Sequence, residues 1–227
     1  MVMGSMPMPG GWTMSMAWVR LSDETWAAAV ISFLVMWVVM MAAMMLPSVT
    51  PTLWRSRYAI TGDRRIVATC RTAALGLGYL LVWGVLGLVI FFVGAVLATL
   101  EMHHGSLARA VPIADGITVL AGGAFQFTRP KVHQLACCRR VPERSRRSST
   151  SAWRDGVHLG VHCSYCSAGL TAILLALGIM DPRAMAAVTV AITLERLAPA
   201  GQRVAQGIGV VAVGGGLVLI AHAFGVS

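Results

Sequence analysis

Two long stretches without a charged side chain constrain this chain more than any other feature of its sequence. Residues 26–46 and 73–100 contain no Asp, Glu, Lys or Arg. A helix needs roughly 20 apolar residues to cross the hydrocarbon core of a bilayer, which is about 30 Å thick. Both stretches are long enough. Because their apolar residues are continuous rather than alternating, they are predicted to be membrane-spanning helices and not strands of a barrel.

The composition of the whole chain points the same way. Of its 227 residues, 57% are hydrophobic and only 12% are charged, whereas a soluble domain has about 25% charged residues. There is too little polar surface to cover one or two soluble domains. This excludes a secreted disulfide scaffold, a nucleic-acid-binding domain and an ordinary cytosolic enzyme, and it makes the lipid bilayer the first expected partner.

Four further apolar segments extend the pattern, at residues 111–128, 161–180, 184–194 and 204–224. The segment 184–194 has only eleven residues, or about 16 Å of helix, and crosses only if its charged ends reach the interface or are buried. We therefore predict an all-α fold, a polytopic transmembrane helix bundle with six spans, with five spans as the alternative. Residues 1–25 are predicted to be a Met-rich extracytoplasmic segment, and residues 26–227 the transmembrane domain.

The positive charges predict the orientation. Fifteen of the eighteen Lys and Arg residues follow the first, third or fifth predicted span, and eight of them lie in a long loop at about residues 129–160. Positive loops stay in the cytoplasm, so this basic loop is predicted to be cytoplasmic and both termini outside. The net charge of +9 is thus explained by topology, and no nucleic-acid partner is expected.

Methionine is concentrated in two places. Six of the fourteen methionines fall within the first sixteen residues. Five more lie in one ten-residue part of the first span: Met36, Met40, Met41, Met44 and Met45. Spacings of four residues place Met36, Met40 and Met44 along one side of a helix, with Met41 and Met45 as a parallel row. Thioethers are soft donors suited to Cu(I), although methionine also fills gaps in apolar cores.

Cysteines and histidines gather near the predicted cytoplasmic ends of the third and fourth spans. Cys137 and Cys138 follow the third span, while Cys163 and Cys166 form a C-x-x-C at the start of the fourth. A structural disulfide is not expected on the reducing side of the membrane, and Cys70 stands alone.

Histidines precede that C-x-x-C. His158, His162 and Cys166 share a spacing of four residues, so a continuous helix would align them, unless Gly156 and Gly160 interrupt it. Imidazole and thiolate together suit Cu or Zn. The predicted metal ligands are Cys163, Cys166, Cys138, Cys137, His158, His162, Met36, Met40, Met44 and Met45.

Two carboxylates lie in or near predicted hydrocarbon. Asp115 is expected in the first turn of the third span, where a carboxylate suits the helix dipole. Glu195 is expected to pair with the adjacent Arg196 at the interface.

Four short motifs carry a resemblance to a known family. They are Met36-Trp37…Ala43-Met44-Met45-Leu46-Pro47-Ser48…Pro51, Gly123-Ala124-Phe125-Gln126…Lys131…Leu135…Cys138-Arg139, Gly156…Gly160…Cys163-Ser164-Tyr165-Cys166 and Gly178…Met180…Met185…Glu195-Arg196…Pro199. The pattern resembles a bacterial family of predicted metal-binding integral membrane proteins. That family is similar to the copper-chaperone-like membrane proteins that accompany some bacterial tyrosinases.

The resemblance implies a multi-pass protein of the bacterial inner membrane that binds metal, with copper as the best candidate. Zinc stays the alternative because the Cys and His donor set also suits it. Two positions depart from it. Gln134 and Ser167 stand where the family pattern has cysteines, which favours a weaker, transfer-competent site.

Three functions remain open. The first is binding of Cu(I) for copper handling or for delivery to a recipient cuproenzyme. The second is an accessory role as a structural subunit of a larger membrane complex, with glycines such as Gly84, Gly87 and Gly214 allowing close helix packing. The third is a membrane copper or thiol redox enzyme. The sequence shows no acid–base pair, nucleophile or phosphate loop, so a non-catalytic role is expected.

Overall fold

The computed structural model describes residues 5–7, 13–15, 25–58, 65–131, 149–179 and 181–224. Its named helices, in chain order, are α1 (Trp26–Tyr58), α2 (Arg65–His103), α3 (Gly105–Phe125), α5 (Ser149–Leu177), α6 (Pro182–Leu197) and α7 (Gly201–Ala223). Two three-residue strands, β1 (Ser5–Pro7) and β2 (Thr13–Ser15), pair antiparallel near the amino terminus. Apart from this small hairpin, the described fold is helical as predicted.

Four of the helices are long and apolar enough to cross a membrane. The qualifying ranges are Trp26–Pro47, Thr69–His103, Ala152–Leu177 and Gly201–Ala223. They correspond to the first, second, fourth and sixth predicted spans. Membrane localisation is therefore plausible on length and composition.

The other two predicted spans are helices too, but shorter ones. The apolar part of α3 is Ala110–Phe125, and α6 has 16 residues, which is about 24 Å of helix. That is less than the roughly 30 Å of a hydrocarbon core. Six crossings are thus not established by helix length alone.

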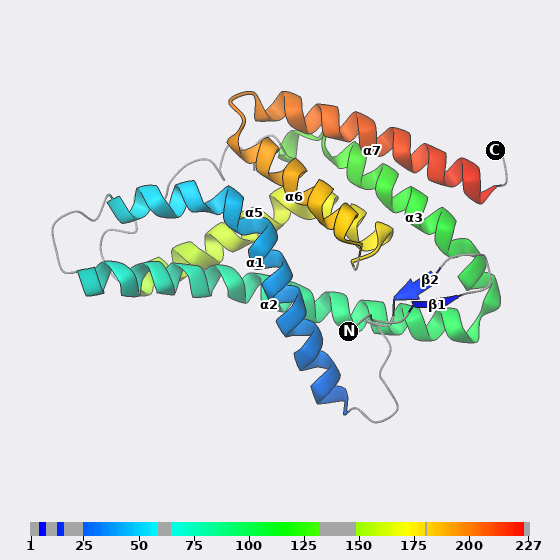
Figure 1. Ribbon diagram of the computed structural model, residues 1–227, viewed down its shortest axis with the longest axis horizontal. Coiled ribbons are helices and arrows are strands. Elements are labelled where there is room, and N and C mark those ends of the chain that lie inside the picture. Colours follow the sequence, from blue (N-terminus) through cyan, green and yellow to red (C-terminus); the bar gives the residue numbers. More distant parts are fainter. Residues whose placement is uncertain are drawn as a thin grey trace.

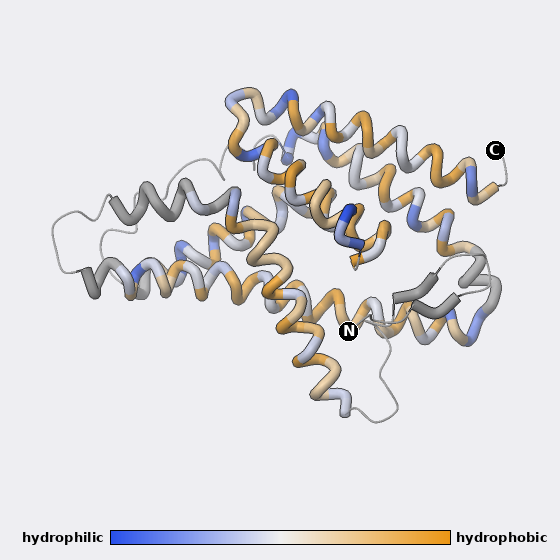
Figure 2. The backbone as a smooth tube through the Cα atoms, viewed as in Figure 1, coloured by the Kyte–Doolittle hydropathy of each residue, from blue (hydrophilic) through white to orange (hydrophobic). Residues whose placement is uncertain are grey.

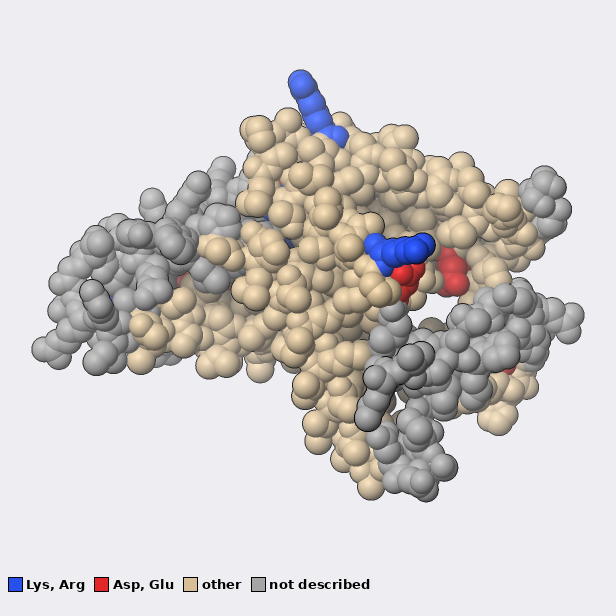
Figure 3. Space-filling view, in the orientation of Figure 1, with Lys and Arg blue, Asp and Glu red and all other residues tan. Residues whose placement is uncertain are grey.

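The outside of the described helices is strongly apolar. Ile31, Val35 and Val39 on α1 are each about three-fifths exposed, as is Leu77 on α2. Figure 2 shows apolar residues on all the long helices, and Figure 3 shows few charged side chains on the described part of the face in view. Large exposed apolar surfaces are rare on soluble monomers, so these faces fit contact with lipid.

Two pairs of helices pack closely, one pair parallel and the other antiparallel (Figure 1). Helices α2 and α5 run the same way, since Gly78 on α2 lies against Trp153 and Gly160 further along α5 lies against Val82. Helices α3 and α7 run in opposite directions, because Gly116 lies against Ile220 whereas the later Gly123 lies against Val213. Helices α1 and α6 complete the arrangement.

Helix α5 begins earlier than the sequence predicted. It is continuous from Ser149, so residues 149–160 are helical and not part of a loop. The rest of the predicted basic loop, residues 132–148, lies outside the described residues. Gly156 and Gly160 do not interrupt α5, which runs unbroken through both. A Cβ on Gly156 would overlap the Leu75 backbone of α2, so this glycine lets two helices approach closely.

Helix α1 continues past Pro47 to Tyr58, whereas the uncharged run that predicted the first span ends at residue 46. A proline inside a helix removes one backbone hydrogen bond and bends the helix without necessarily ending it. Figure 1 shows that α1 changes direction along its length, and Pro47 and Pro51 are the residues in its sequence able to cause this.

The core contains large side chains from α1 and α2. Trp37 is fully buried and its indole Nε1 donates a hydrogen bond of 3.0 Å to the carbonyl of Trp83. Phe33 packs between Trp37 and Phe91, at centroid distances of 6.0 and 5.2 Å. These contacts fix α1 across α2 and set the position of the methionines one to two turns further along α1.

A tight turn positions α6. Gly178 has a φ of 108°, which favours glycine, and the Asp181 side chain accepts a 2.9 Å hydrogen bond from the Arg183 amide at the start of the helix. From this cap α6 runs back along the core, so that its last turn reaches α5.

Candidate metal centre

Four helices meet at the sulfur of Cys163. This residue of α5 is fully buried. Its Sγ lies 3.9 Å from Sδ of Met45 on α1 and shares a 3.0 Å hydrogen bond with Oη of Tyr79 on α2. Arg196 on α6 donates to the same Sγ from Nη2 at 2.9 Å. A thiol, a thioether, a phenol and a guanidinium thus converge at one buried atom.

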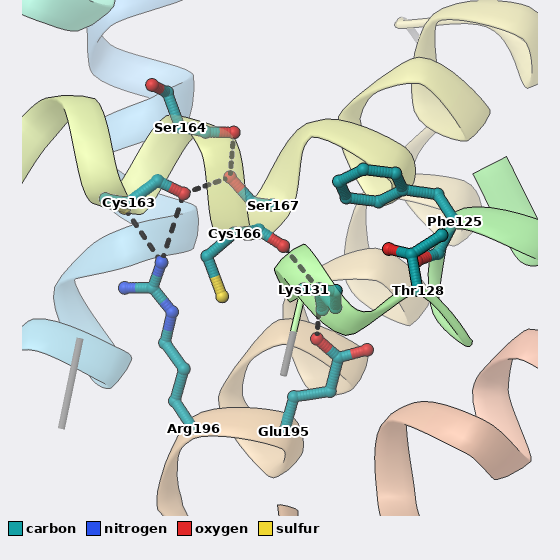
Figure 4. Close-up of polar contacts among 9 residues, drawn as sticks. All are labelled: Phe125, Thr128, Lys131, Cys163, Ser164, Cys166, Ser167, Glu195 and Arg196. Atoms are coloured by element: carbon teal, nitrogen blue, oxygen red, sulfur yellow. Dashed lines mark hydrogen bonds and ion pairs between the residues drawn. The ribbon is translucent and has the colours of Figure 1, made fainter. Parts of the chain in front are cut away.

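Arg196 also holds the backbone at this point. Its Nη2 lies 3.3 Å from the carbonyl oxygen of Cys163, and Ser167 donates to that oxygen at 2.9 Å. Figure 4 shows the guanidinium directed at the Cys163 region, with the Cys166 thiol on the same side of α5. The arrangement places a positive charge directly beside a soft sulfur donor.

A buried ion pair adjoins this cluster. Nζ of Lys131, in the short helical turn that follows α3, lies 2.8 Å from Oε2 of Glu195, and the two side chains are 1% and 2% exposed. The same Nζ donates to the backbone carbonyl of Cys166. The prediction that Glu195 lies at the interface was wrong, because its side chain is buried with Lys131 as its ion-pair partner, and the adjacent Arg196 donates to Cys163 (Figure 4).

The predicted methionine rows face inward. Met40, Met41, Met44 and Met45 are at most 7% exposed, and Met36 is half-buried against the core. Met45 reaches Cys163 directly. The rest extend away from that contact along α1. The interior beside the cysteine is therefore rich in sulfur.

The predicted histidines lie elsewhere on α5. Nε2 of His158 and Nε2 of His162 are 3.1 Å apart, with His158 exposed and His162 half-buried. Within the described ranges, no three His, Cys, Asp or Glu side chains come together as a metal-binding group. Cys137 and Cys138 lie outside the described residues. Asp115 is in the middle of α3, not in its first turn as predicted, because that helix begins ten residues earlier at Gly105.

The sulfur spacing is suited to a soft ion. A metal–sulfur bond is about 2.3 Å long, so two sulfurs on one ion are at most about 4.6 Å apart. The separation of 3.9 Å between Cys163 and Met45 lies within this limit. Thiolate and thioether together form a donor set that selects Cu(I). The residues present therefore fit a copper ion as cargo.

Sequence reasoning missed three of the groups around Cys163. Tyr79 gave no signal, because it lies inside an apolar run. Arg196 was expected to pair with Glu195, and Lys131 was named only as a positive charge and as part of a family motif; neither was predicted as a neighbour of the cysteines. The signal for Lys131 was available, since it is the one lysine in the chain and lies in a motif with Gln126, which is itself buried.

An apolar cavity elsewhere in the described part contributes no ligands. It is an apolar groove of about 830 Å³ between α3, α5, α6 and α7. Residues such as Ile173, Val188, Ile208 and Leu219 line it. Its lining has no titratable or sulfur-bearing side chain, so this groove offers no metal ligand.

Comparison with known proteins identifies the family of this chain. A family model, PpoB2, described as a copper chaperone, matches residues 34–219. No curated protein and no solved structure matches the chain significantly. The four sequence motifs contribute Met45, Lys131, Cys163 with Cys166, and Glu195 with Arg196 to one cluster. The resemblance seen in the motifs is confirmed, and the chain belongs to the copper chaperone family.

Proposed function

We propose that this protein binds Cu(I) at Cys163 and Met45 inside the membrane and delivers it to a cuproenzyme. The observation that carries the proposal is the 3.9 Å contact between a buried thiol and a buried thioether from different helices. Membership of the copper chaperone family supports copper as the ion. Zinc is the weaker alternative, because its usual protein ligands are Cys, His and carboxylate, not thioether.

The groups around the two sulfurs favour exchange over permanent storage. Arg196 lies 2.9 Å from the sulfur that would hold copper. Two positive charges about 4 Å apart repel each other by roughly 4 kcal/mol at an effective dielectric constant near 20. Ser167, which stands where the family pattern has a cysteine, uses its hydroxyl on the Cys163 carbonyl instead. Both features lower copper affinity and make release to a recipient easier.

We place the protein in the bacterial inner membrane with six crossings and both termini outside. The helix directions support this. Helices α2 and α5, which would be spans 2 and 4, run the same way, and α3 and α7, which would be spans 3 and 6, run in opposite directions. Six alternating crossings require both. The short α3 and α6 cross where neighbouring helices cover their ends; Glu195, near the end of α6, is buried by its pairing with Lys131. The basic connections after α1, α3 and α6 then face the cytoplasm.

Anaerobic copper loading tests the metal site. The full-length protein, purified in detergent, is loaded with Cu(I) under reducing conditions, and bound copper is measured by elemental analysis. Cys163→Ser and Met45→Leu should each lower the copper bound at limiting Cu(I). Cys70→Ser and Met102→Leu, at exposed positions, are the matched controls and should not.

X-ray absorption of the loaded protein gives the ligand type. Sulfur scattering at the copper edge that decreases in Met45→Leu is the expected result. A protein that binds no copper above background refutes the copper function. Copper that is retained unchanged in Cys163→Ser refutes the site.

A further inference from the structure

The pair of histidines on α5 is not used by the sulfur cluster. His158 and His162 are one helical turn apart, and their ring centroids are 4.2 Å apart at an interplanar angle of 60°. Their Nε2 atoms face each other at 3.1 Å. Around the helix axis, His158 lies about 140° and His162 about 100° from Cys163, so the pair lies on a different side of the helix from the buried sulfur.

The geometry points to a second metal site: we propose that His158 and His162 together bind a divalent transition-metal ion. An ion about 2.0–2.1 Å from each nitrogen would join them at an angle of roughly 100°. This lies between the square-planar and tetrahedral values that Cu²⁺ and Zn²⁺ adopt. Imidazole is a ligand for these borderline ions, whereas the Met45 thioether beside the Cys163 thiol favours Cu(I).

The position of the pair makes it reachable from water. Trp153 and Arg154 precede it on α5 and are exposed, as is typical of the membrane interface. His158 is four residues beyond Arg154, about 6 Å along the helix. Imidazoles at this depth are costly in lipid and mark functional sites by default. Two protein ligands leave coordination positions open for water or for a side chain of another protein.

This site does not depend on the proposed copper function, since it uses different residues and a different class of ion. Helix α5 nevertheless carries both sites within about one turn: the buried Cys163 sulfur, suited to a soft ion, and the outward histidine pair, suited to a borderline ion. The pair therefore accepts or exchanges divalent ions at the surface without competing for the sulfur of Cys163.

Nickel titration of the full-length protein tests the pair, because Ni²⁺ binds imidazole and is not reduced by thiols. Calorimetry with Ni²⁺ alone should show an affinity that falls at least tenfold in His158→Gln and in His162→Gln. His103→Gln and His222→Gln change exposed histidines on other helices and are the matched controls. Unchanged Ni²⁺ binding in the double variant His158→Gln/His162→Gln overturns the site.

Chemical protection keeps the test independent of any variant's folding. Diethyl pyrocarbonate acylates accessible imidazoles, and mass spectrometry reports each histidine separately in the unaltered protein. Ni²⁺ should protect His158 and His162 together while His103 continues to react. Equal reaction of all three with and without Ni²⁺ refutes the proposal, and it does so without bearing on Cu(I) binding at Cys163.

Discussion

The buried pair of Lys131 and Glu195 gives the sharpest test of the structure. Glu195→Gln keeps the shape of the side chain but removes its charge. Lys131 is then left in the interior with the Cys166 carbonyl but without its carboxylate at 2.8 Å. Removing one member of a buried ion pair costs about 3–5 kcal/mol, because the other charge is left uncompensated. With side-chain exposures of 1% and 2%, the full cost is expected.

Thermal unfolding in detergent micelles, followed by circular dichroism, measures this cost. A chain of 150–250 residues loses roughly 2–4 °C of Tm per kcal/mol, so Glu195→Gln should unfold about 6–20 °C below the unaltered protein. The matched control is the double variant Lys131→Met/Glu195→Leu, which removes both charges and keeps similar volumes. It should recover most of the lost Tm, because replacing a whole buried pair by apolar residues is often neutral.

Two results would refute the reasoning. A shift of less than about 2 °C in Glu195→Gln corresponds to at most about 1 kcal/mol and would mean that the pair is exposed to water. A double variant Lys131→Met/Glu195→Leu that unfolds at or below the Tm of Glu195→Gln would show that the loss does not come from an uncompensated Lys131 charge.

Two further predictions concern packing and burial. Gly156→Ala should destabilise the protein by about 1–3 kcal/mol, because the added Cβ overlaps the Leu75 backbone. The control Gly76→Ala, whose Cβ meets nothing within 4 Å, should be neutral or stabilising in the same thermal assay. Equal effects of the two variants would contradict the α2–α5 contact. A thiol reagent mapped by mass spectrometry should modify exposed Cys70 far faster than buried Cys163, and similar rates would show that Cys163 is open to solvent.

Sequence reasoning predicted the helices well because their signal is local. The uncharged runs at residues 26–46 and 73–100 lie within helices that qualify as spans, and lipid leaves such runs no other backbone structure. Helix ends were predicted less well. Pro47 and Gly156 both look like breaks in the sequence, yet one lies within a helix and the other at a close helix contact, which depends on the neighbouring helices.

The candidate site was predicted in its residue types but not in its contacts. Cys163 and Met45 were named from their chemistry, whereas the partner of Glu195 was not, because Lys131 is 64 positions away in sequence. A local reading prefers the adjacent Arg196. Desolvation decides otherwise: a carboxylate at 2% exposure needs a cation that is equally buried, and Lys131 is the residue that meets this requirement.

Tyr79 provides a test of how the protein adjusts its copper affinity. Tyr79→Phe removes only the hydroxyl that shares a 3.0 Å hydrogen bond with the Cys163 sulfur. Loss of a group that orients a metal ligand typically lowers metal affinity by about 10–100-fold. Because Met45 still contacts the sulfur, a decrease of roughly tenfold, at the lower end of that range, is expected.

Competition between the protein and a Cu(I) chelator measures this affinity. Tyr165→Phe, on α5 like Cys163 but 58% exposed, is the matched control and should leave the affinity unchanged. Equal affinities of Tyr79→Phe and the unaltered protein would mean that the hydroxyl turns away once copper is bound. The phenol would then stabilise only the metal-free thiol, and Tyr79→Phe should lower Tm without copper while leaving Tm with copper unchanged.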